Sequence, residues 1–529
     1  MDKDIIAMNP NPLVAALQKP AREFTKADII NYIRNHDIRM VNFMYPGGDG
    51  RLKTLSFVIN SMRHLDDILS CGERVDGSSL FNFIQADSSD LYVLPRFSTA
   101  FINPFTEIPT LCMLCSYFDK DGQPLASAPE HTLIKAAETF RRVTSMEFQA
   151  MGELEYYVVR PYTRLTTDYY YGEFPQNDAY PATDQHGYHE SSPFAKVGDL
   201  RMKCMQYISQ AGGQIKYGHS EVGNFTFENK CEYSDYRNRS LGSYVYEQNE
   251  IEFLPVDVVE AADQLMIAKW VIRNQAYVDG FNVTFAPKIT AGKAGSGLHI
   301  HMRMMENGHN RMLSGGVLSD EARRAIAGMI DVAGSITAFG NKNPTSYFRL
   351  VPHQEAPTNI CWGDRNRSVL IRVPLGWTAN TDMCHMANPQ EPPQTIDTTQ
   401  KQTVEMRSPD GSADIYQLLA GLCVACRHGF EMENALDVAA RTYVDVNIHD
   451  EANAARQAQL ATLPDSCVAS AACLERQRSV FEKYGVFSPA AIDGIISQLR
   501  AFDDADLRSR LEGDKKATEE LVQRFFHCG

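Results

Sequence analysis

The stretch FNVTFAPKITAGKAGSGLHIHM, residues 281–302, joins an apolar strand-like segment to a glycine-rich turn and two closely spaced histidines. Val283 and Phe285 alternate with polar residues, and His299 and His301 lie two residues apart after the turn. Residues two apart on a strand face the same side, so both imidazoles are predicted to point into one site. The glycines let the backbone approach a ligand closely or adopt positive φ. A histidine pair of this kind is as often structural, so its interpretation depends on the charged strands around it.

The bulk composition is typical of a large folded protein. The 529 residues suffice for one large domain with a smaller one, or for three average domains. The net charge of −15 argues against nucleic acid or an anionic membrane as a partner. No apolar run reaches the roughly 18 residues of a membrane-spanning helix, and the first residues lack the apolar core of a signal peptide. Twelve cysteines are too few for a disulfide framework, so a cytoplasmic location is predicted.

The predicted elements divide the chain into an arm and two domains. Residues 1–24 contain two Asn-Pro pairs and no periodicity, which predicts an extended N-terminal arm. Residues 25–125 begin with a helix capped by Thr25 and continue as short strands, including a hairpin around PGGDG (46–50); this pattern predicts a small α+β domain. Residues 126–529 form the predicted catalytic domain, whose last part, from about residue 412, has an almost wholly helical pattern.

Charged side chains recur two residues apart on four predicted strands. These pairs are Glu153/Glu155, Glu250/Glu252, His299/His301 and Glu405/Arg407. Two carboxylates on one strand face repel each other unless cations lie between them. Ligand sets rich in Glu and poor in His suit Mg²⁺ or Mn²⁺ better than Zn²⁺. Each pair alone is equally compatible with a strand edge facing solvent, but four such pairs beside apolar residues favour a metal-lined funnel.

Arginines cluster in the segment that follows the histidines. They are Arg349, Arg365, Arg367, Arg372 and Arg407. Guanidinium groups bind phosphate and carboxylate, and together with divalent cations they neutralise the charge of a phosphoryl group in transfer. Neither a Walker loop nor a kinase signature is present. The alternative for some of these arginines, Arg365 first, is pairing with surface carboxylates.

Eight motifs occur in the order found in the glutamine synthetase family, and the chain resembles its type I branch. The motifs are VDGSSL, GELEYY, HSEVG, QNEIEF, GSGLHIH, YFRLVPHQEAP, RNRSVLIRVP and VEMRSPD. The resemblance implies an α+β fold, with a β-grasp-like N-terminal domain and a catalytic domain whose curved antiparallel sheet forms a metal funnel backed by helices. It also implies a homo-oligomer, a dodecamer of two hexameric rings with active sites between neighbours.

The resemblance further implies a reaction and two metal sites. ATP, the co-substrate, would phosphorylate the γ-carboxylate of L-glutamate, and ammonium would then displace phosphate to give glutamine. Two or three Mg²⁺ or Mn²⁺ ions are implied in each site. One ion would be held by Glu155, Glu221 and Glu250. The other would be held by Glu153, His299 and Glu405.

Roles for the remaining site residues also follow from the resemblance. Arg349, Arg407 and the backbone of Gly295 would hold glutamate, Arg367 and Arg372 would face phosphate, and His301 would face the nucleotide. Asp76 and Ser79 of a neighbouring subunit would form the ammonium pocket with Tyr188 and Glu221. A carboxylate there favours NH₄⁺ and takes its proton. Glu355 resembles the residue that shields the acyl-phosphate from water.

The chain departs from the family pattern at three residues and two insertions. Ala294 replaces an Asn before the GSG turn, Arg303 replaces a Ser, and Thr403 replaces a basic residue. Our hypothesis is that Arg303 restores, in the nucleotide site, the positive charge lost at Thr403. The insertions, near residues 224–246 and 376–400, either reshape the mouth of the site or extend surface loops or subunit contacts. The departures leave two alternatives to a glutamine synthetase: a γ-glutamyl-amide ligase for a polyamine or another amine, and a non-catalytic relative.

Overall fold

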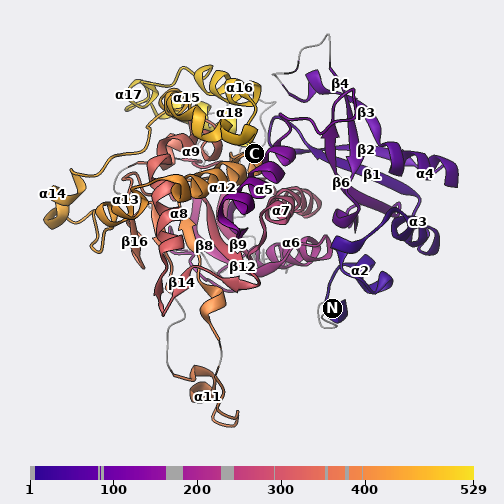
Figure 1. The fold of residues 1–529 in the computed structure, drawn as a ribbon, viewed down its shortest axis with the longest axis horizontal. Helices are drawn as coiled ribbons and strands as arrows, with labels where there is room; N and C mark the ends of the chain where they lie inside the picture. The colour runs from indigo at the N-terminus through magenta and orange to yellow at the C-terminus, as the bar shows by residue number, and fades with distance from the viewer. Residues whose placement is uncertain are drawn as a thin grey trace, which may run out of the picture.

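Two β-sheets, one in each half of the chain, form the framework of the protein (Figure 1). The structure, a computed structural model, describes residues 6–81, 84, 89–161, 183–227, 244–290, 292–351, 356–375, 381–395 and 397–529. Helices pack against both sheets, so the predicted α+β fold class is confirmed. The predicted domain limits at residues 24 and 125 stay predictions.

The N-terminal sheet has six strands in the order β2-β1-β6-β4-β3, with β5 paired to β6. Its strands are β1 (Met40–Pro46), β2 (Leu52–Val58), β3 (Glu73–Asp76), β4 (Asp90–Pro95), β5 (Phe101–Ile102) and β6 (Thr110–Phe118). The hairpin predicted around residues 46–50 is confirmed as β1 and β2. Helices α3 (Lys26–Asn35) and α4 (Met62–Cys71) belong to this half, and Thr25 caps α3 in a reciprocal capping box with Asp28.

The prediction of an extended arm over residues 1–24 is wrong for the part that the structure describes. Helix α2 (Pro12–Leu17) and the 3₁₀ turn η1 (Ala21–Glu23) lie within it. The Asn11 side chain accepts a hydrogen bond from the Leu13 N–H, and Pro12 occupies the first helical position. Leu13 is fully buried in the apolar core of the N-terminal half, so the segment packs against that core.

The second sheet has ten strands and carries the site residues. Its order is β16-β17-β18-β12-β7-β9-β8; in addition, β10 and β11 pair with β7, and β13 pairs with β12. Its long strands are β7 (Glu147–Pro161), β8 (Ile215–Phe227), β9 (Tyr244–Phe253) and β12 (Leu298–Glu306). Its short strands are β10 (Val256–Asp257), β11 (Asn282–Thr284), β13 (His309–Asn310), β16 (Trp362–Asp364), β17 (Ile371–Val373) and β18 (Val404–Met406). The pairings are antiparallel except between β16 and β17.

Helices cover one side of this sheet and leave the other open. The longer ones are α5 (Pro129–Thr144), α6 (Gly198–Gln210), α7 (Val258–Val278), α8 (Asp320–Asp331), α9 (Ala333–Gly340), α12 (Ile415–Glu431), α13 (Ala435–Thr442), α15 (Cys467–Glu482), α16 (Pro489–Arg500) and α18 (Lys515–Phe525). Short helices α10 (Ser346–Arg349), α14 (Ala454–Gln457) and α17 (Leu507–Arg510) join them. Helix α12 is buried along almost its whole length and packs against α5 and α8. The main apolar core lies between these helices and the sheet.

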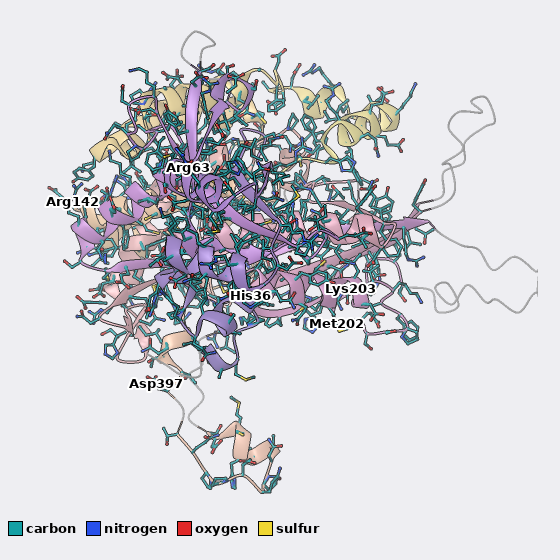
Figure 2. The ribbon with its side chains drawn as sticks, turned by 90° about the vertical axis from the view of Figure 1, so that its right-hand side faces the viewer. His36, Arg63, Arg142, Met202, Lys203 and Asp397 are labelled. Carbon is teal, nitrogen blue, oxygen red and sulfur yellow. The ribbon has the colours of Figure 1, made fainter. Side chains whose placement is uncertain are left out.

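The second insertion leaves the body of the protein. Helix α11 (Met383–Ala387) stands apart from every other labelled element, and the segment returns near Asp397 (Figures 1 and 2). It forms a small unit of its own, because Asp382 accepts hydrogen bonds from the backbone of His385 and of Gln394. This insertion therefore extends a surface segment, one of the two alternatives that the sequence left open.

A buried lysine on α7 makes stability depend on pH. Lys269 is 1% exposed and donates a hydrogen bond to the Gly411 carbonyl at 2.8 Å. Burial, and then the charge of Arg273, lower the pKa of Lys269 to about 7 from the ordinary 10.5. Between those two values the unfolded chain binds a proton that the folded chain has released, so this residue makes stability rise with pH.

We expect Lys269→Met to remove that pH dependence. Melting temperatures measured between pH 7 and pH 10 should rise more for the unaltered protein than for the variant. The variant should be the more stable of the two at pH 7, where the buried ammonium costs most. Parallel curves over that pH range would contradict the prediction.

Candidate active site

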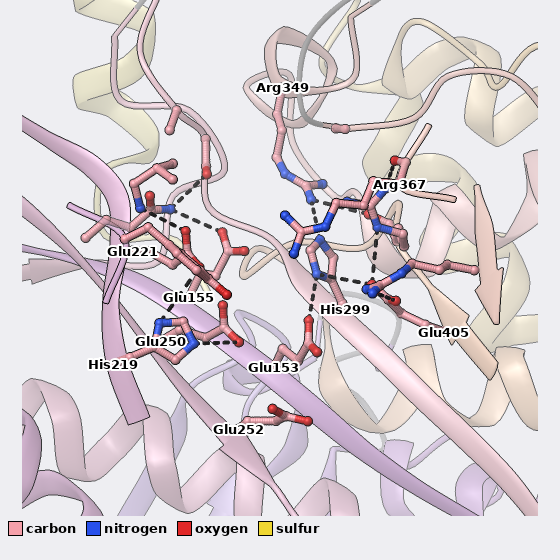
Figure 3. A pocket seen from close by; sticks show the side chains of 18 of the residues that line it. Glu153, Glu155, His219, Glu221, Glu250, Glu252, His299, Arg349, Arg367 and Glu405 are labelled. Atoms are coloured by element: carbon pink, nitrogen blue, oxygen red, sulfur yellow. Dashed lines mark hydrogen bonds and ion pairs between the residues drawn. The ribbon is translucent and has the colours of Figure 1, made fainter. Parts of the chain in front are cut away.

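An open cavity of about 1200 Å³ lies over the uncovered face of the second sheet (Figure 3). Side chains from β7, β8, β9, β12, β17 and β18 line it, together with the turn before β12 and the segments that follow α10 and β16. Most of the charged residues singled out from the sequence lie here.

Strand pairing arranges these residues in rows across the sheet. In one row His299 of β12 lies opposite Glu153 of β7, which lies opposite Glu252 of β9. In the next row Glu155 of β7 lies opposite Glu250 of β9. Side chains directly opposite on one face have Cβ atoms about 4.5–5.5 Å apart, so the rows bring the carboxylates together.

The first predicted metal set is assembled. Glu153, His299 and Glu405 each offer a ligand atom, and these atoms lie within 4.8 Å of one another. Glu153 Oε2 lies 2.9 Å from His299 Nδ1, and Glu405 Oε1 lies 3.6 Å from the same nitrogen. His301 approaches the other oxygen of Glu153 at 2.8 Å. Both oxygens of Glu153 thus contact imidazoles.

Two members of the second predicted set, Glu221 and Glu250, are grouped with a residue outside that set, and the set itself stays a prediction. The grouped ligands are His219, Glu221 and Glu250, with His219 at 3.9 Å and 3.8 Å from the two carboxylates. Glu155 lines the same cavity, but its Oε2 accepts hydrogen bonds from the Gly297 N–H at 2.6 Å and from the Gln248 amide at 3.2 Å.

The charges of the two sets alter their pKa values in opposite directions. Burial, and then the neighbouring glutamates, raise the pKa of Glu250 well above its ordinary value. Burial would also raise the pKa of Glu153, but the charges and hydrogen bonds of His301 and His299 hold it well below the ordinary value. Glu153 in turn raises the pKa of His301 against the effect of burial. Carboxylates crowded in this way, with imidazole and without thiolate in the grouped sets, fit Mg²⁺ or Mn²⁺.

The arginines lie in the same cavity, beside the first of these sets. Arg372 and Arg407 both contact the buried Glu405 carboxylate, at 3.0 Å and 3.2 Å. Arg349 donates to the backbone carbonyl of Ser408 at 2.8 Å. Arg367 is exposed and lines the cavity (Figure 3). Arg365 is also exposed and lines it, and the alternative that Arg365 pairs with a surface carboxylate stays open.

Two residues of the expected ammonium pocket lie outside the cavity. Asp76 and Ser79 are exposed at the end of β3, and neither is among the described residues that line the cavity. Hydrogen bonds from Ser79 and Ser78 hold the pKa of Asp76 below its usual range. Tyr188 lines the cavity, is 49% exposed, and stacks on His189 with ring centroids 4.1 Å apart. Glu355 lies outside the described residues.

The departures from the family pattern have distinct surroundings. Ala294 is buried, and its carbonyl accepts a hydrogen bond from the Tyr157 hydroxyl at 2.9 Å. Thr403 Oγ1 lies 2.9 Å from His301 Nδ1. Arg303 is held by the Gln149 side chain and the Gln400 carbonyl, and it is not among the described residues that line the cavity. The hypothesis that Arg303 replaces a charge in the nucleotide site therefore stays untested.

Several cavity residues escaped the sequence reasoning, among them His219, Lys216 and Gln248. His219 lies two residues before Glu221, so the spacing rule used for the other pairs applies to it. Lys216 contacts Glu252 at 2.6 Å. Gln248 donates to the Gly295 carbonyl at 2.9 Å, the backbone group that was expected to hold glutamate.

Comparisons with known proteins agree on one family. Residues 236–512 match the family described as "Glutamine synthetase, catalytic domain", and residues 37–120 match "Glutamine synthetase, beta-Grasp domain". The glutamine synthetase of Frankia alni is 30% identical over 438 residues, 78% of this chain and 82% of that protein. A 3-hydroxylaminophenol mutase of Cupriavidus pinatubonensis is 26% identical over 490 residues, 89% of this chain and 94% of that protein.

A solved structure extends the comparison to the whole fold. The GmaS/ADP complex superposes with a TM-score of 0.70 at 19% identity, covering 93% of this chain and 99% of that one. The match to the β-grasp family and this likeness confirm the predicted fold of both halves. Among the described residues, the helices are all too short or too polar to span a membrane.

Proposed function

Because the chain belongs to the glutamine synthetase family, we propose that it is an ATP-dependent ligase that joins ammonium to the γ-carboxylate of L-glutamate, giving glutamine, ADP and phosphate. The observation that carries this proposal is that two carboxylate–imidazole groups share one cavity with several guanidinium groups, two of which contact the Glu405 carboxylate of the first group. Metals and arginines side by side in one cavity suit the transfer of a phosphoryl group between two anions.

The metal ligands proposed here join the predicted sets to the observed ones. Glu153, His299 and Glu405 would hold one Mg²⁺ or Mn²⁺. Glu221 and Glu250 would hold a second ion with His219, or with Glu155 after its carboxylate turns from the Gly297 N–H. Bound metal supplies neutralisation of the phosphate charge. The lowered pKa of Glu153 supports this role, because that carboxylate stays ionised at neutral pH.

The cationic residues would bind the substrates. Arg349 and Arg407 would hold the carboxylates of glutamate, and Arg367 and Arg372 would face the phosphoryl group. Arg349, Arg372 and Arg407 contact Glu405 or backbone carbonyls, which fixes their guanidinium planes beside the cavity before substrate enters. His301 would lie toward the nucleotide. Glu355 is proposed as the shield of the acyl-phosphate.

The ammonium pocket would be completed by a second copy of the chain, within a dodecamer of two rings. Asp76 and Ser79 are exposed and lie outside the cavity of their own chain, as expected of residues that contribute to the active site of a neighbouring copy. The hydrogen bonds from Ser79 and Ser78 keep Asp76 anionic, which suits the binding of NH₄⁺.

Phosphate release from ATP, measured with Mg²⁺, L-glutamate and ammonium, tests this function. We expect turnover that ammonium stimulates, and Asp76→Asn should lower it about a hundredfold, the lower end of the contribution of general base catalysis. Asp90→Asn is the matched control, because Asp90 is exposed directly opposite Asp76 on the neighbouring strand. Equal losses in both variants, or turnover that does not depend on ammonium, would contradict the proposal.

A second candidate is a γ-glutamyl-amide ligase that uses a larger amine. It is favoured by the half-exposed ring of Tyr188, which forms an aromatic wall with His189 and His219, whose ring centroids lie 4.3 Å apart. Aromatic faces bind organic ammonium groups. The same assay with a panel of amines separates the candidates, since stimulation by a larger amine and not by ammonium would support this one.

A further inference from the structure

A second cavity, of about 700 Å³, lies where the ten-stranded sheet ends at β16, and we call it the edge cavity. Residues of β16, of α8 and α13, and of the hairpin formed by β14 (Leu313–Ser314) and β15 (Val317–Leu318) line it. These elements lie together on the side of the protein away from the N-terminal sheet (Figure 1). Pockets for small organic ligands have volumes of about 300–1,000 Å³, so the edge cavity has the size of such a site.

An aromatic pair and two exposed aliphatic side chains give the edge cavity its apolar surface. Trp362 is 5% exposed, its indole N–H donates to the Ala439 carbonyl at 2.7 Å, and its ring centroid lies 4.8 Å from that of Tyr443. Val317 and Leu375 are 62% and 64% exposed in the same cavity. Apolar side chains that remain in water around a concave surface mark a place where an apolar ligand would be buried.

The charged residues of the edge cavity differ in their partners. Arg323 pairs with Asp320 at 3.2 Å, and the carboxylate of Asp364 lies 3.5 Å from the Tyr443 hydroxyl. Arg365 is exposed, and its charge acts on the same hydroxyl, but no carboxylate of a described residue forms an ion pair with it. A guanidinium group beside an aromatic pair suits a ligand that joins an apolar body to a carboxylate.

The backbone holds Arg365 at the boundary between two cavities. Arg365 lines both the edge cavity and the active-site cavity. Its φ of 55° lies in the left-handed region, which is uncommon for a residue with a Cβ atom, and its N–H donates to the Val373 carbonyl at 2.8 Å. Residues held in this region cluster at ligand sites and switch segments.

The same segment carries residues of the active site. Arg367 and Arg372 line the active-site cavity, whereas Trp362 and Val373 line the edge cavity. Arg372 and Val373 are neighbours on β17, whose side chains alternate between the two faces of the sheet. A ligand in the edge cavity therefore contacts the strands that position two of the arginines proposed to face the phosphoryl group.

We propose that the edge cavity is a regulatory site for a small organic anion with a flat apolar body and one carboxylate. The carboxylate pairs with Arg365, and the body covers the aromatic pair and the exposed side chains of Val317 and Leu375. Because Arg365 borders both cavities, a ligand that holds its guanidinium in the edge cavity withdraws that charge from the active site. The regulation rests on the proposed function, whereas the binding site does not.

Isothermal titration calorimetry of the full-length protein with 2-naphthoate tests the binding site. We expect one bound 2-naphthoate per chain, and at least tenfold weaker binding of the neutral 2-naphthalenemethanol and of the cationic 2-naphthylmethylamine. Ala440→Trp should weaken 2-naphthoate binding at least tenfold, because Ala440 is exposed in the edge cavity and does not line the active-site cavity. Ala455→Trp is the matched control, since Ala455 is exposed on α14 and lines neither cavity.

Phosphate release from ATP, with Mg²⁺, L-glutamate and ammonium, tests the regulation. We expect 2-naphthoate to change turnover at least twofold in the unaltered protein and in Ala455→Trp, and to leave turnover of Ala440→Trp unchanged. If Ala440→Trp fails to fold, Val317→Asp replaces it, because a negative charge at this exposed position should repel the carboxylate.

The outcomes separate this inference from the proposed function. Absence of 2-naphthoate binding, or binding that neither Ala440→Trp nor Val317→Asp weakens, would overturn the site. Tighter binding of the amine than of the acid would overturn the pairing with Arg365 and point to Asp364. Binding without an effect on turnover would overturn the regulation alone. A protein without turnover would contradict the proposed function, while the calorimetry would still decide whether the edge cavity binds the anion.

Discussion

Glu153→Gln is expected to lower turnover about a thousandfold and to weaken Mn²⁺ binding in parallel. The two carboxylate oxygens of Glu153 contact His299 and His301, at 2.9 Å and 2.8 Å. Glu153 also belongs to two of the three sets of residues in the cavity that could hold a metal ion. The amide keeps the size of the side chain but removes its charge, so the ion that Glu153 would hold loses a ligand. Loss of one group that stabilises charge in a transition state typically costs 10²–10³-fold, and a metal ligand that also contacts two imidazoles belongs at the upper end.

Glu147→Gln is the matched control, because Glu147 begins the same strand and its side chain is 59% exposed. Turnover is measured as phosphate release and metal binding by Mn²⁺ titration, so loss of chemistry and loss of metal are seen separately. A variant at residue 153 that keeps both properties within threefold would show that this carboxylate is a structural partner of the two histidines.

The strand faces of the site were predictable because side-chain direction along a strand has a period of two. Glu153 and Glu155 do share a face, and so do His299 and His301. Which strand lies beside which depends on pairing between residues more than a hundred positions apart, as between His299 and Glu153. Only the resemblance to a known family joined Glu153, His299 and Glu405 into one set, and the structure groups the same three residues.

The second set shows where local rules fail. Strand β8 has a register shift between Ser220 and Asn224, opposite Asn249 and Glu247 of β9. Residues 221–223 of β8 lie opposite Gln248 alone, so two extra residues redirect the side chains next to them, and Glu221 lies within this bulge. His219 precedes the shift and lies directly opposite Glu250. The period of two could have singled out His219, which lies two residues before Glu221, but the pairing that places it beside Glu250 depends on the tertiary fold.

The N-terminal segment was mispredicted for a different reason. The Asn-Pro pairs and the lack of periodicity were interpreted as signs of an extended arm, although Asn at the N-cap followed by Pro at the first position also begins a helix. An extended arm and the start of a helix can therefore share the same Asn-Pro sequence. Helix α2 forms because Leu13 and Val14 pack into the core of the N-terminal half, and that burial depends on the tertiary fold.

Asp263→Ala is expected to destabilise the protein by about 3–5 kcal/mol, because it leaves a largely buried guanidinium without its partner. Arg96, which follows β4 of the N-terminal sheet, donates two hydrogen bonds of 2.7 Å to Asp263 of α7, and Tyr416 of α12 donates a third at 2.5 Å. The pair therefore joins the two halves of the chain. Urea denaturation followed by tryptophan fluorescence measures the loss, and Trp270 at the same junction contributes to that signal.

The loss of stability should depend on whether one charge of the pair is removed or both. Arg96→Met/Asp263→Leu removes both charges, and replacing a buried ion pair by apolar side chains is often neutral, so the double variant should be more stable than Asp263→Ala. Lys203→Met is the surface control: its contact with Asp279 at 3.1 Å, near the end of the same helix, is half-exposed and should be worth less than about 1 kcal/mol. If Asp263→Ala and the double variant lost equal stability, packing at the junction would account for the loss. A more stable double variant would instead show that the fold tolerates the absence of this ion pair far better than the presence of one unpaired charge.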